Sequence, residues 1–385
     1  MTYILIGIVL LFLVLFSMDI VWYIREISMR FHMGRFQDKV VWEKAVLYCL
    51  MKWAKKMPVV TMSDQRRLII LDLMRGKFRS KTIQSWQTAL VYSAVSEYYS
   101  SSKEQNKIET LFSKEIKEDG NWKKEPTEID GALLAYYILK YTEDVSRVKP
   151  AMDVMYHLIL KHKKEDGLIC YRQSSKETRF VDTLGLVCPF LCAYGEKYDY
   201  KEAIQLAINQ VKEYERYGIH PNFCIPVHAY NANDKNPLGL YGWGRGLVWY
   251  LLALCECYEI LDNAKAERTF FKEDILKKGD SLMCFQKENG GIGWIIQNKN
   301  TYDSSATAGY AYFYAIAYKI CADKKFYDVS QGALECLMTC TQRNGAIDYS
   351  QGDTKGIGMY SNTFSIMPFT QGLTYLAICK LSEEI

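Results

Sequence analysis

Apolar residues recur at intervals of three and four positions through most of the chain beyond residue 40, which is the spacing of an amphipathic helix. Proline is rare, with 8 residues in total, and Pro126, Pro221 and Pro237 fall between the periodic stretches. The pattern predicts twelve helices, at residues 40–56, 82–100, 104–117, 128–141, 148–162, 182–194, 201–217, 242–261, 266–283, 304–321, 325–342 and 363–381. A stretch at 63–74 is a possible thirteenth, short helix. Strand signals are scarce and limited to short stretches such as 291–296.

The predicted helices differ in how much of their circumference is apolar. Alternate predicted helices contain more apolar and small residues than their neighbours. The stretches 184–193 and 306–317 illustrate this, in contrast to the charged stretch 201–217. A helix that is apolar all round belongs inside a protein, whereas a helix with one apolar stripe belongs outside. Inner and outer helices joined by short turns form a double ring, and the chain lacks the sustained repeat of an open solenoid. The sequence therefore predicts an all-α fold, an (α/α)6 toroid, over residues 40–385.

In such a ring, the loops that lead into the inner helices gather at one end and form a cleft. Polar residues at the starts of inner helices are therefore the first candidates for a functional role. Five residues meet this condition: Asp130, Asp182, Trp243, Arg245 and Asp303.

The N-terminus differs in kind from the rest of the chain. Residues 2–16 are continuously apolar, and Asp19 is the only charge before a second apolar run at 20–24, so the stretch is about as long as a bilayer requires. Basic residues follow it: Arg25, Arg30, Arg35 and Lys39. Because basic residues tend to stay on the cytoplasmic side, we expect a membrane anchor at 1–24, a basic linker at 25–39 and a toroid that faces the cytoplasm. A cleaved signal or an interfacial segment is the alternative.

Composition narrows the class of protein. With 49% hydrophobic and 24% charged residues, the 385-residue chain has the make-up of a globular protein. Its formal net charge of +4 and the lack of a dense basic stripe predict no nucleic-acid partner. The 12 cysteines lie mostly in apolar helical stretches, which favours free thiols in a reducing compartment. Cys188 with Cys192, and Cys336 with Cys340, lack the further ligands of a zinc site.

Two acids stand at equivalent places on neighbouring inner helices. Asp182 opens an apolar stretch, and Asp130 has the same position one hairpin earlier. An acid at a helix start is often a cap for free N–H groups, which is the alternative for each of them. If the two acids face one another across the cleft, each raises the pKa of the other, and one can stay protonated near neutral pH as a general acid.

A histidine, an arginine and two tryptophans are the other candidates for the cleft. His228 lies in a loop between predicted helices, where a surface position is the alternative to a role in the site. Arg245 begins an apolar helix between Trp243 and Trp249, where a charge requires a partner. Its guanidinium suits a two-pronged bond to a carboxylate, with tryptophan as a stacking wall. The alternative is a structural ion pair with one of the acids named above.

The order and spacing of these residues resemble those of a known family. Across about residues 40–385, the chain is similar to the unsaturated glucuronyl and unsaturated rhamnogalacturonyl hydrolases, glycoside hydrolase families 88 and 105. The resemblance rests on these segments: Val181-Asp182-Thr183-Leu184, then Pro189-Phe190-Leu191 and Tyr194-Gly195, then His228-Ala229-Tyr230, then Trp243-Gly244-Arg245-Gly246 with Trp249, and Ser304-Ser305-Ala306-Thr307-Ala308.

The resemblance implies a glycosidase that removes a terminal 4,5-unsaturated uronic acid from an oligosaccharide by hydration of the vinyl ether. In that scheme Asp182 donates a proton to C4, and its carboxylate then deprotonates the water that adds at C5. The resulting hemiketal opens and expels the rest of the saccharide. Asp130 would hold ring hydroxyls and tune Asp182, and His228 would hydrogen-bond the sugar. The pocket would be shaped by Trp243, Arg245 and Trp249, and no metal or organic cofactor is implied.

The chain also departs from the family pattern. Rhamnogalacturonyl members carry a His-Lys pair shortly before the catalytic Asp, and this chain has Tyr171-Arg172 there, which keeps a cation for substrate binding. Leu247-Val248 replaces an Asn-Gly pair, and the aromatic and polar signature of the last inner helix is reduced to Phe369-Thr370-Gln371-Gly372. These differences bear on the substrate more than on the fold.

Two other functions stay open beside this one. A conventional inverting glycosidase would use Asp130 and Asp182 as acid and base, with room for a water between them. A non-catalytic protein tethered to the membrane would only bind saccharide or act as a scaffold. The uronic acid, the aglycone and the oligomeric state are left open as well.

Overall fold

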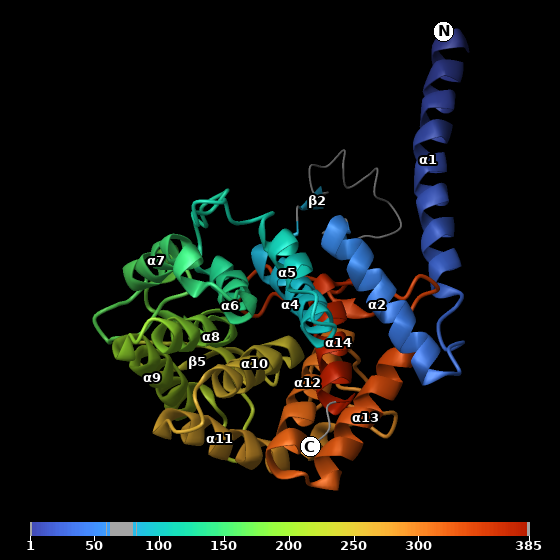
Figure 1. Cartoon of the computed structure of the whole chain (residues 1–385). Coiled ribbons are helices and arrows are strands. Elements are labelled where there is room, and N and C mark those ends of the chain that lie inside the picture. The colour runs from blue at the N-terminus through green and yellow to red at the C-terminus, as the bar shows by residue number, and fades with distance from the viewer. Residues whose placement is uncertain (1, 59, 62–79, 82, 383–385) are drawn as a thin grey trace.

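The computed structural model of the chain describes residues 2–58, 60–61, 80–81 and 83–382 (Figure 1). The possible short helix at 63–74 lies outside the described residues. Around the ring of Figure 1, helices follow one another in chain order, and α1 (Thr2–Arg30) extends away from this body.

Within the described residues, six inner helices form a closed ring. Each inner helix contacts the next one, and the last contacts the first. In chain order they are α4 (Ser85–Ser101), α6 (Ala132–Tyr141), α8 (Asp182–Lys197), α10 (Gly244–Ile260), α12 (Ser304–Cys321) and α14 (Pro368–Ser382). Helix α8 is buried continuously from Thr183 to Gly195, as a helix that is apolar all round requires.

Six outer helices surround this ring and pack on the inner ones. They are α2 (Lys39–Lys55), α5 (Gln105–Phe112), α7 (Val145–Lys161), α9 (Lys201–Gly218), α11 (Ala266–Leu282) and α13 (Lys324–Thr339). Each buries one stripe, as α9 does with Ile204, Ala207, Val211 and Tyr214. The arrangement confirms the predicted (α/α)6 toroid. The helix predicted at 104–117 ends at Phe112, and the one predicted at 363–381 begins at Pro368.

Short strands connect the helices at one end of the ring. The longest sheet has the order β3 (Thr178–Phe180), β4 (Val227–Asn231) and β5 (Pro237–Tyr241), all antiparallel. The β4–β5 hairpin was not predicted, since its apolar residues do not alternate clearly with polar ones. The strand expected at 291–296 is wrong: only Ile295 takes part in a bridge there, with Trp243.

Two further pairs are short: β1 (Val60–Thr61) with β2 (Ser80–Lys81), and β6 (Ser350–Gln351) with β7 (Phe364–Ser365). The second pair closes the base of the long connection between α13 and α14.

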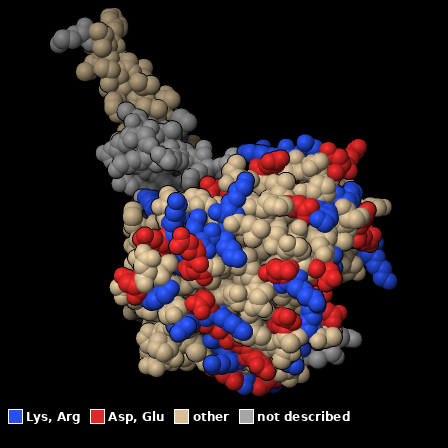
Figure 2. Space-filling view, turned by 90° about the vertical axis from the view of Figure 1, so that its left-hand side faces the viewer, with Lys and Arg blue, Asp and Glu red and all other residues tan. Residues whose placement is uncertain are grey.

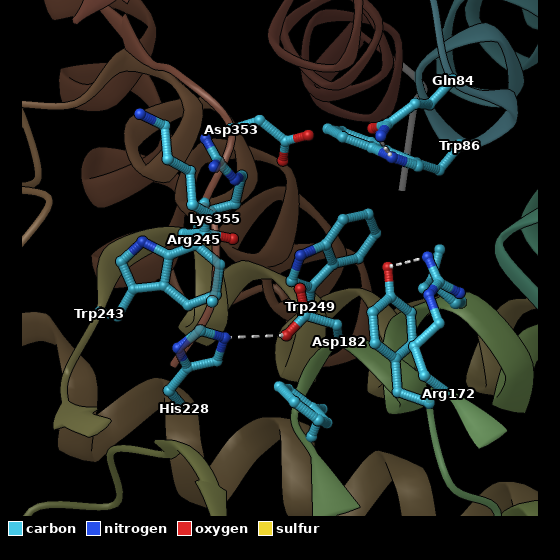
Figure 3. Close-up of a pocket in the computed structure, with 15 residues that line it drawn as sticks. Gln84, Trp86, Arg172, Asp182, His228, Trp243, Arg245, Trp249, Asp353 and Lys355 are labelled. Carbon is cyan, nitrogen blue, oxygen red and sulfur yellow. Dashed lines mark hydrogen bonds and ion pairs between the residues drawn. The ribbon is translucent and has the colours of Figure 1, made fainter. Parts of the chain in front are cut away.

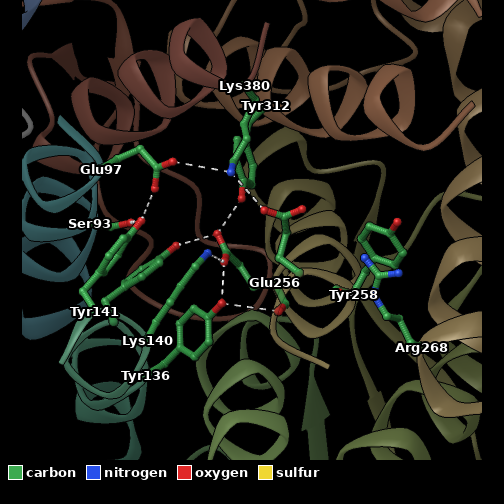
Figure 4. A network of polar contacts seen from close by, with 12 residues as sticks. Ser93, Glu97, Tyr136, Lys140, Tyr141, Glu256, Tyr258, Arg268, Tyr312 and Lys380 are labelled. Atoms are coloured by element: carbon green, nitrogen blue, oxygen red, sulfur yellow. Dashed lines mark hydrogen bonds and ion pairs between the residues drawn. The ribbon is translucent and has the colours of Figure 1, made fainter. Parts of the chain in front are cut away.

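A buried polar network lies near the C-terminal ends of the inner helices (Figure 4). Glu256 of α10 is fully buried and accepts hydrogen bonds from Tyr136 at 2.6 Å, Tyr137 at 2.9 Å and Tyr312 at 2.7 Å. Lys140 adds an ion pair at 2.8 Å. A buried carboxylate is tolerated only when it is paired and hydrogen-bonded, and here two other inner helices, α6 and α12, supply the partners. The network therefore joins α6, α10 and α12.

Helix α1 is the one helix among the described residues that is long and apolar enough to cross a membrane, by length and composition; a signal sequence meets the same test. It continues through the boundary expected at residue 24 to Arg30. On the face of the toroid shown in Figure 2, side chains of both signs are interspersed rather than gathered into one field.

Candidate active site

A pocket of about 310 Å³ opens where the first turns of α4, α8 and α10 meet the wall segment, which we define as residues 352–363 (Figure 3). This volume is at the lower end for small-ligand sites, which suits one sugar ring better than a chain. The lining residues are Gln84, Trp86, Tyr171, Arg172, Phe180, Asp182, Leu186, His228, Trp243, Arg245, Trp249, Asp353, Thr354, Lys355 and Gly356.

Asp182 is the acid at the centre of the pocket. It is the first residue of α8, its side chain is 15% exposed, and its Oδ2 atom has no hydrogen-bond partner among the described residues. Burial raises the pKa of Asp182 to about 7, with the negative charges of Asp353 and Asp130 adding to the rise and Arg245 opposing it. The carboxyl is therefore close to half protonated at neutral pH, which is the state that a general acid–base residue requires.

His228 faces Asp182 across the pocket (Figure 3). Its Nε2 atom is 3.7 Å from Oδ2 of Asp182, longer than a hydrogen bond, and its Nδ1 atom is buried without a partner. The ring is held by Trp243, with centroids 4.5 Å apart, and by Phe180 at 5.7 Å and Tyr360 at 5.6 Å. Burial, with Arg245 nearby, lowers the pKa of His228 to about 4, so the imidazole is neutral at pH 7.

Local structure explains how this histidine reaches the site. It lies in β4, where the pairing with β5 shifts register between Val227 and Ala229, rather than in a surface loop. Its carbonyl accepts a hydrogen bond from the N–H of Val181, at 3.0 Å, directly before α8 begins. The sheet therefore brings His228 beside Asp182.

Asp130 is held by Arg172 in a bidentate ion pair. The Nη2–Oδ2 distance is 2.6 Å and the Nη1–Oδ1 distance is 3.3 Å, and Arg172 also reaches Glu128 at 3.2 Å. The guanidinium lies 4.0 Å from the centroid of Tyr171 and donates to its hydroxyl at 3.1 Å. Burial raises the pKa of Tyr171 well above its usual value, so this hydroxyl keeps its proton. Asp130 lies outside the set of residues that line the pocket.

Arg245 is buried, and among the described residues its guanidinium has no acid within ion-pair distance. Its guanidinium donates to the carbonyl of Gln351 and, at 2.8 Å, to that of Gly352. Trp243 donates from Nε1 to Oε1 of the same glutamine at 3.0 Å, and Asp303 accepts from its backbone N–H at 3.0 Å. These bonds secure the start of the wall segment, while the positive charge of Arg245 still acts on Asp182.

Two tryptophan rings, Trp86 and Trp249, form one aromatic side of the pocket, and Phe369 packs against both. Trp249 of α10 lies edge-on to Trp86 of α4, with centroids 5.3 Å apart, and contacts Phe369 of α14 at 4.9 Å. Gly185 of α8 permits this packing, because a Cβ there would approach the backbone oxygen of Trp249 to 2.6 Å. Rings arranged in this way offer an apolar face to a sugar ring.

Of the fifteen residues that line the pocket, seven were predicted from the sequence: Tyr171, Arg172, Asp182, His228, Trp243, Arg245 and Trp249. Gln84, Trp86, Phe180, Leu186 and the stretch 353–356 line the pocket as well. Trp86 lies at the start of an inner helix. Asp182 was chosen as a candidate because of such a position, so the same criterion would also have identified Trp86. Asp353 and Lys355 belong to a long connection without periodicity, and no local signal distinguishes them from other loop residues. Among the described residues, no three His, Cys, Asp or Glu side chains gather as a metal site would require.

The fold and the pocket define the class of protein: a helical toroid with a carboxyl of raised pKa, that of Asp182, in a pocket of sugar size. Comparison with known proteins agrees with this class. The sequence pattern described as Glycosyl Hydrolase Family 88 matches residues 53–383. The chain belongs to this family and is a glycoside hydrolase. No curated protein matches it in sequence.

Solved structures share the fold at low sequence identity. A possible member of family 105 from Salmonella enterica serovar Paratyphi A is 16% identical, covers 90% of this chain and 94% of its own, and has a TM-score of 0.72. An unsaturated glucuronyl hydrolase from Bacillus sp. GL1, described as responsible for the degradation of glycosaminoglycan, is 15% identical, covers 89% and 95%, and has a TM-score of 0.61. One specific for heparin is 13% identical, covers 89% and 96%, and has a TM-score of 0.62.

Proposed function

We propose that this glycoside hydrolase removes a terminal 4,5-unsaturated uronic acid from oligosaccharides by hydrating its vinyl ether. The observation that carries the proposal is the state of Asp182: a carboxyl with an unpartnered oxygen, in the pocket, with a pKa raised to about 7. Hydration of a vinyl ether needs one group that first donates and then accepts a proton, and a carboxyl with a pKa near neutrality does both. The similarity to unsaturated glucuronyl hydrolases supports the same substrate class.

In the proposed reaction, protonated Asp182 gives its proton to C4 of the sugar, and the positive charge develops at C5 and the ring oxygen. Water adds its oxygen to C5 and its proton passes to the Asp182 carboxylate, which restores the acid. The hemiketal at C5 then breaks its bond to the ring oxygen and becomes a ketone. The open hemiacetal at C1 releases the remaining saccharide as an alcohol and leaves an aldehyde.

The other pocket residues have roles that follow from their chemistry. Neutral His228 has an unpartnered Nδ1 atom and an Nε2 atom 3.7 Å from Asp182, so it can hydrogen-bond a sugar hydroxyl or the water. Arg172 and Lys355 provide positive charge for the uronate carboxylate, a group that cations hold by charge-assisted hydrogen bonds. Trp86 and Trp249 provide the apolar face for the ring.

A second candidate rests on Asp353. This acid also lines the pocket, and its charge acts on Asp182, whereas Asp130 is occupied by Arg172. A conventional inverting hydrolysis would use Asp182 as the acid and Asp353 as the base that activates water. In that reaction a saturated substrate would be cleaved, and the sugar would not need a double bond.

The first test follows the ultraviolet absorbance of the double bond in oligosaccharides that polysaccharide lyases produce, with the full chain in detergent. Asp182→Asn is expected to lower kcat by about a thousandfold, because it removes the only proton donor of the step. Asp328→Asn is the matched control, since this acid is 55% exposed on α13, outside the pocket lining. If wild type leaves the absorbance unchanged with rhamnogalacturonan, glycosaminoglycan and other uronate products, the proposal is wrong.

The second test separates the two candidates by running the reaction in D2O. Hydration of the vinyl ether places one deuterium at C4, which nuclear magnetic resonance of the product detects. Inverting hydrolysis of a saturated uronide leaves C4 unlabelled and requires Asp353, so Asp353→Asn would then abolish turnover of saturated substrates. Turnover without deuterium at C4 would favour the second candidate.

We also propose that α1 anchors the protein in a membrane with the toroid on the cytoplasmic side. The helix is apolar over most of its length, and the basic residues Arg25, Arg30 and Arg35 follow the apolar stretch. Protease added to intact cells is expected to leave the toroid uncut, and protease added after lysis is expected to cut it. Cleavage in intact cells would place the toroid outside.

A further inference from the structure

The wall segment, residues 352–363, forms one side of the pocket through residues 353–356. It is a loop whose two ends are brought together by the β6–β7 pair, in which Ser350 lies opposite Ser365 and Gln351 opposite Phe364. The position of residues 353–356 therefore depends on how firmly this short base is held.

The inner side of the base is held by the toroid itself. Gln351 takes hydrogen bonds from Arg245 and Trp243 and donates to Asp303. Its side-chain amide also donates to the carbonyl of Ser361, at 3.0 Å, which ties the start of the wall segment to its end.

The outer side of the base is held by the last residue of α1. Arg30 donates from Nε to Oδ2 of Asp348 at 2.8 Å and from Nη2 to Oδ1 at 2.9 Å. Its Nη2 atom also donates to the carbonyl of Phe364 at 3.0 Å. One guanidinium therefore joins the residue two positions before β6 to the first residue of β7.

The environment of this contact makes it a strong one. The side chain of Asp348 is 1% exposed, and it also accepts from Gln342 at 2.6 Å and from the N–H of Tyr349 at 2.6 Å. Arg30 is 27% exposed, forms an ion pair with Glu26 at 3.2 Å, and lies 5.4 Å from the ring centroid of Tyr349. A planar guanidinium can satisfy a carboxylate and a carbonyl at once, which a lysine ammonium does not do in the same geometry.

We infer that Arg30 is a positioning residue for the active site: by joining Asp348, just before β6, to Phe364 of β7 at the base of the wall segment, it sets the place of residues 353–356 in the pocket. Helix α1 is thus part of the machinery that shapes the pocket, in addition to any role as an anchor. The kinetic consequence of this inference rests on the proposed function; the structural consequence does not.

The structural consequence is measured by hydrogen–deuterium exchange of the full chain in detergent. Loss of the charge-assisted bonds in Arg30→Ala is expected to speed exchange of amides in residues 352–365 by about tenfold or more, while exchange in the outer helix α7, which packs on α6 and α8, stays as in wild type. Arg25→Ala is the matched control, because Arg25 is an exposed arginine on the same helix. It is expected to leave exchange unchanged everywhere.

Arg30→Lys distinguishes two roles of Arg30: bonding Asp348 and Phe364 together through one guanidinium, and neutralising the charge of Asp348. It keeps a cation beside Asp348, so the melting temperature is expected to stay near that of wild type while exchange in 352–365 remains fast. Wild-type exchange in both Arg30 variants would overturn the inference. Faster exchange over all inner helices alike would overturn it too, because Arg30 would then contribute only to global stability.

The kinetic arm uses the unsaturated oligosaccharide that wild type prefers. Both Arg30 variants are expected to raise KM by about fivefold to tenfold and to change kcat little, because the wall binds substrate and does not transfer the proton. If no oligosaccharide is turned over by wild type, the proposed function fails and the exchange result still decides the inference. If wild type is active and the Arg30 variants keep its KM, the inference is overturned.

Discussion

At the scale of single residues, the proposed hydration rests on one carboxyl, that of Asp182. Asp182 has an unpartnered oxygen and a pKa raised to about 7, and the neighbouring His228 has a pKa lowered to about 4. Both shifts come first from burial, which disfavours the charged form of either group. The pair therefore stands as a partly protonated acid beside a neutral imidazole, which is the arrangement that the proposed proton transfer from Asp182 requires.

The pH dependence of the reaction follows from this assignment. Because Asp182 must be protonated to donate, kcat/KM is expected to be level below about pH 6 and to fall about tenfold per unit well above pH 7. His228 is expected to add no change between pH 5 and 8, since its pKa is about 4. Steady-state rates from pH 5 to 9 test this. A rate that rises through pH 7 would mean that Asp182 acts as a carboxylate in the first step.

Asp182→Asn is expected to stabilise the fold while it removes activity. The pKa of Asp182 is higher in the folded than in the unfolded chain, so the folded state holds the proton more tightly, and stability falls as pH rises from about 4 to about 7. The amide carries no such charge and is expected to raise the free energy of unfolding by about 2 kcal/mol at pH 8 and very little at pH 4. Urea denaturation at both pH values measures the difference. An equal effect at the two values would contradict the shifted pKa.

At the scale of elements, the close approach of inner helices sets the geometry of the pocket. Gly185 of α8 faces Trp249 of α10, and its hydrogen occupies the place where a side chain would meet the tryptophan backbone at 2.6 Å. The same helix pair carries Asp182 and Arg245 in its first turns. Spacing between these helices therefore decides the spacing of the charges in the pocket.

Gly185→Ala is expected to lower the free energy of unfolding by about 1–3 kcal/mol, because the added methyl group overpacks the contact between α8 and α10. It is also expected to lower activity, since Trp249 must move. The control is Gly332→Ala on the outer helix α13, where the nearest atom lies 3.6 Å from the added Cβ. This change is expected to stabilise by about 0.5–1 kcal/mol. Denaturation curves compare them, and equal effects would contradict the packing argument.

The polar network around Glu256 joins inner helices at the end of the ring away from the pocket. Glu256 lies about 16 Å along α10 from Arg245, by the rise per residue of a helix. Glu256→Ala is expected to lower the free energy of unfolding by about 3–5 kcal/mol, because it leaves Lys140 and three tyrosine hydroxyls without their acceptor. Glu256→Gln keeps an acceptor and is expected to lose less. Urea denaturation measures both, and unchanged KM in the folded variants is expected.

At the scale of the whole molecule, the C-terminal end of α1 is bonded to the toroid. Its 29 residues span about 43 Å, more than the roughly 30 Å of a bilayer core, so its last turns extend beyond any membrane that its apolar part enters. The same last turn holds Asp348 through Arg30. The stretch 25–39 expected as a linker is thus helical and in contact with the toroid up to Arg30.

Two truncations are expected to differ for this reason. Removal of residues 2–24 is expected to keep the protein folded and to release it from membranes, because Arg30 is retained. Removal of residues 2–36 is expected to lower the free energy of unfolding by about 3 kcal/mol, because Asp348 becomes a buried carboxylate without its arginine. Asp348→Asn in the longer deletion is expected to recover part of the loss. Membrane sedimentation and urea denaturation test both, and equal stability of the two truncations would contradict the ion pair.

Much of the fold was open to prediction because its signal is local. Helical periodicity depends on residues three and four apart, and the difference between inner and outer helices appears in each helix by itself, as in 184–193 against 201–217. The start of an inner helix is also a local feature, so Asp182 was found without knowing its neighbours. The β4–β5 hairpin was missed because its burial follows from the bulge and from packing on α9, not from alternation.

The partners of the charged residues were decided only by the tertiary structure. Arg245 donates to the carbonyls of Gln351 in β6 and Gly352 in the wall segment, about a hundred positions away. Asp130 forms its ion pair with Arg172. Asp353 enters the pocket from a loop without any pattern. The sequence alone determined which helices form and which faces are buried, since these depend on short-range spacing. Which charge meets which, and hence the pKa of Asp182, depends on burial and distance between remote segments, which exist only once the ring has closed.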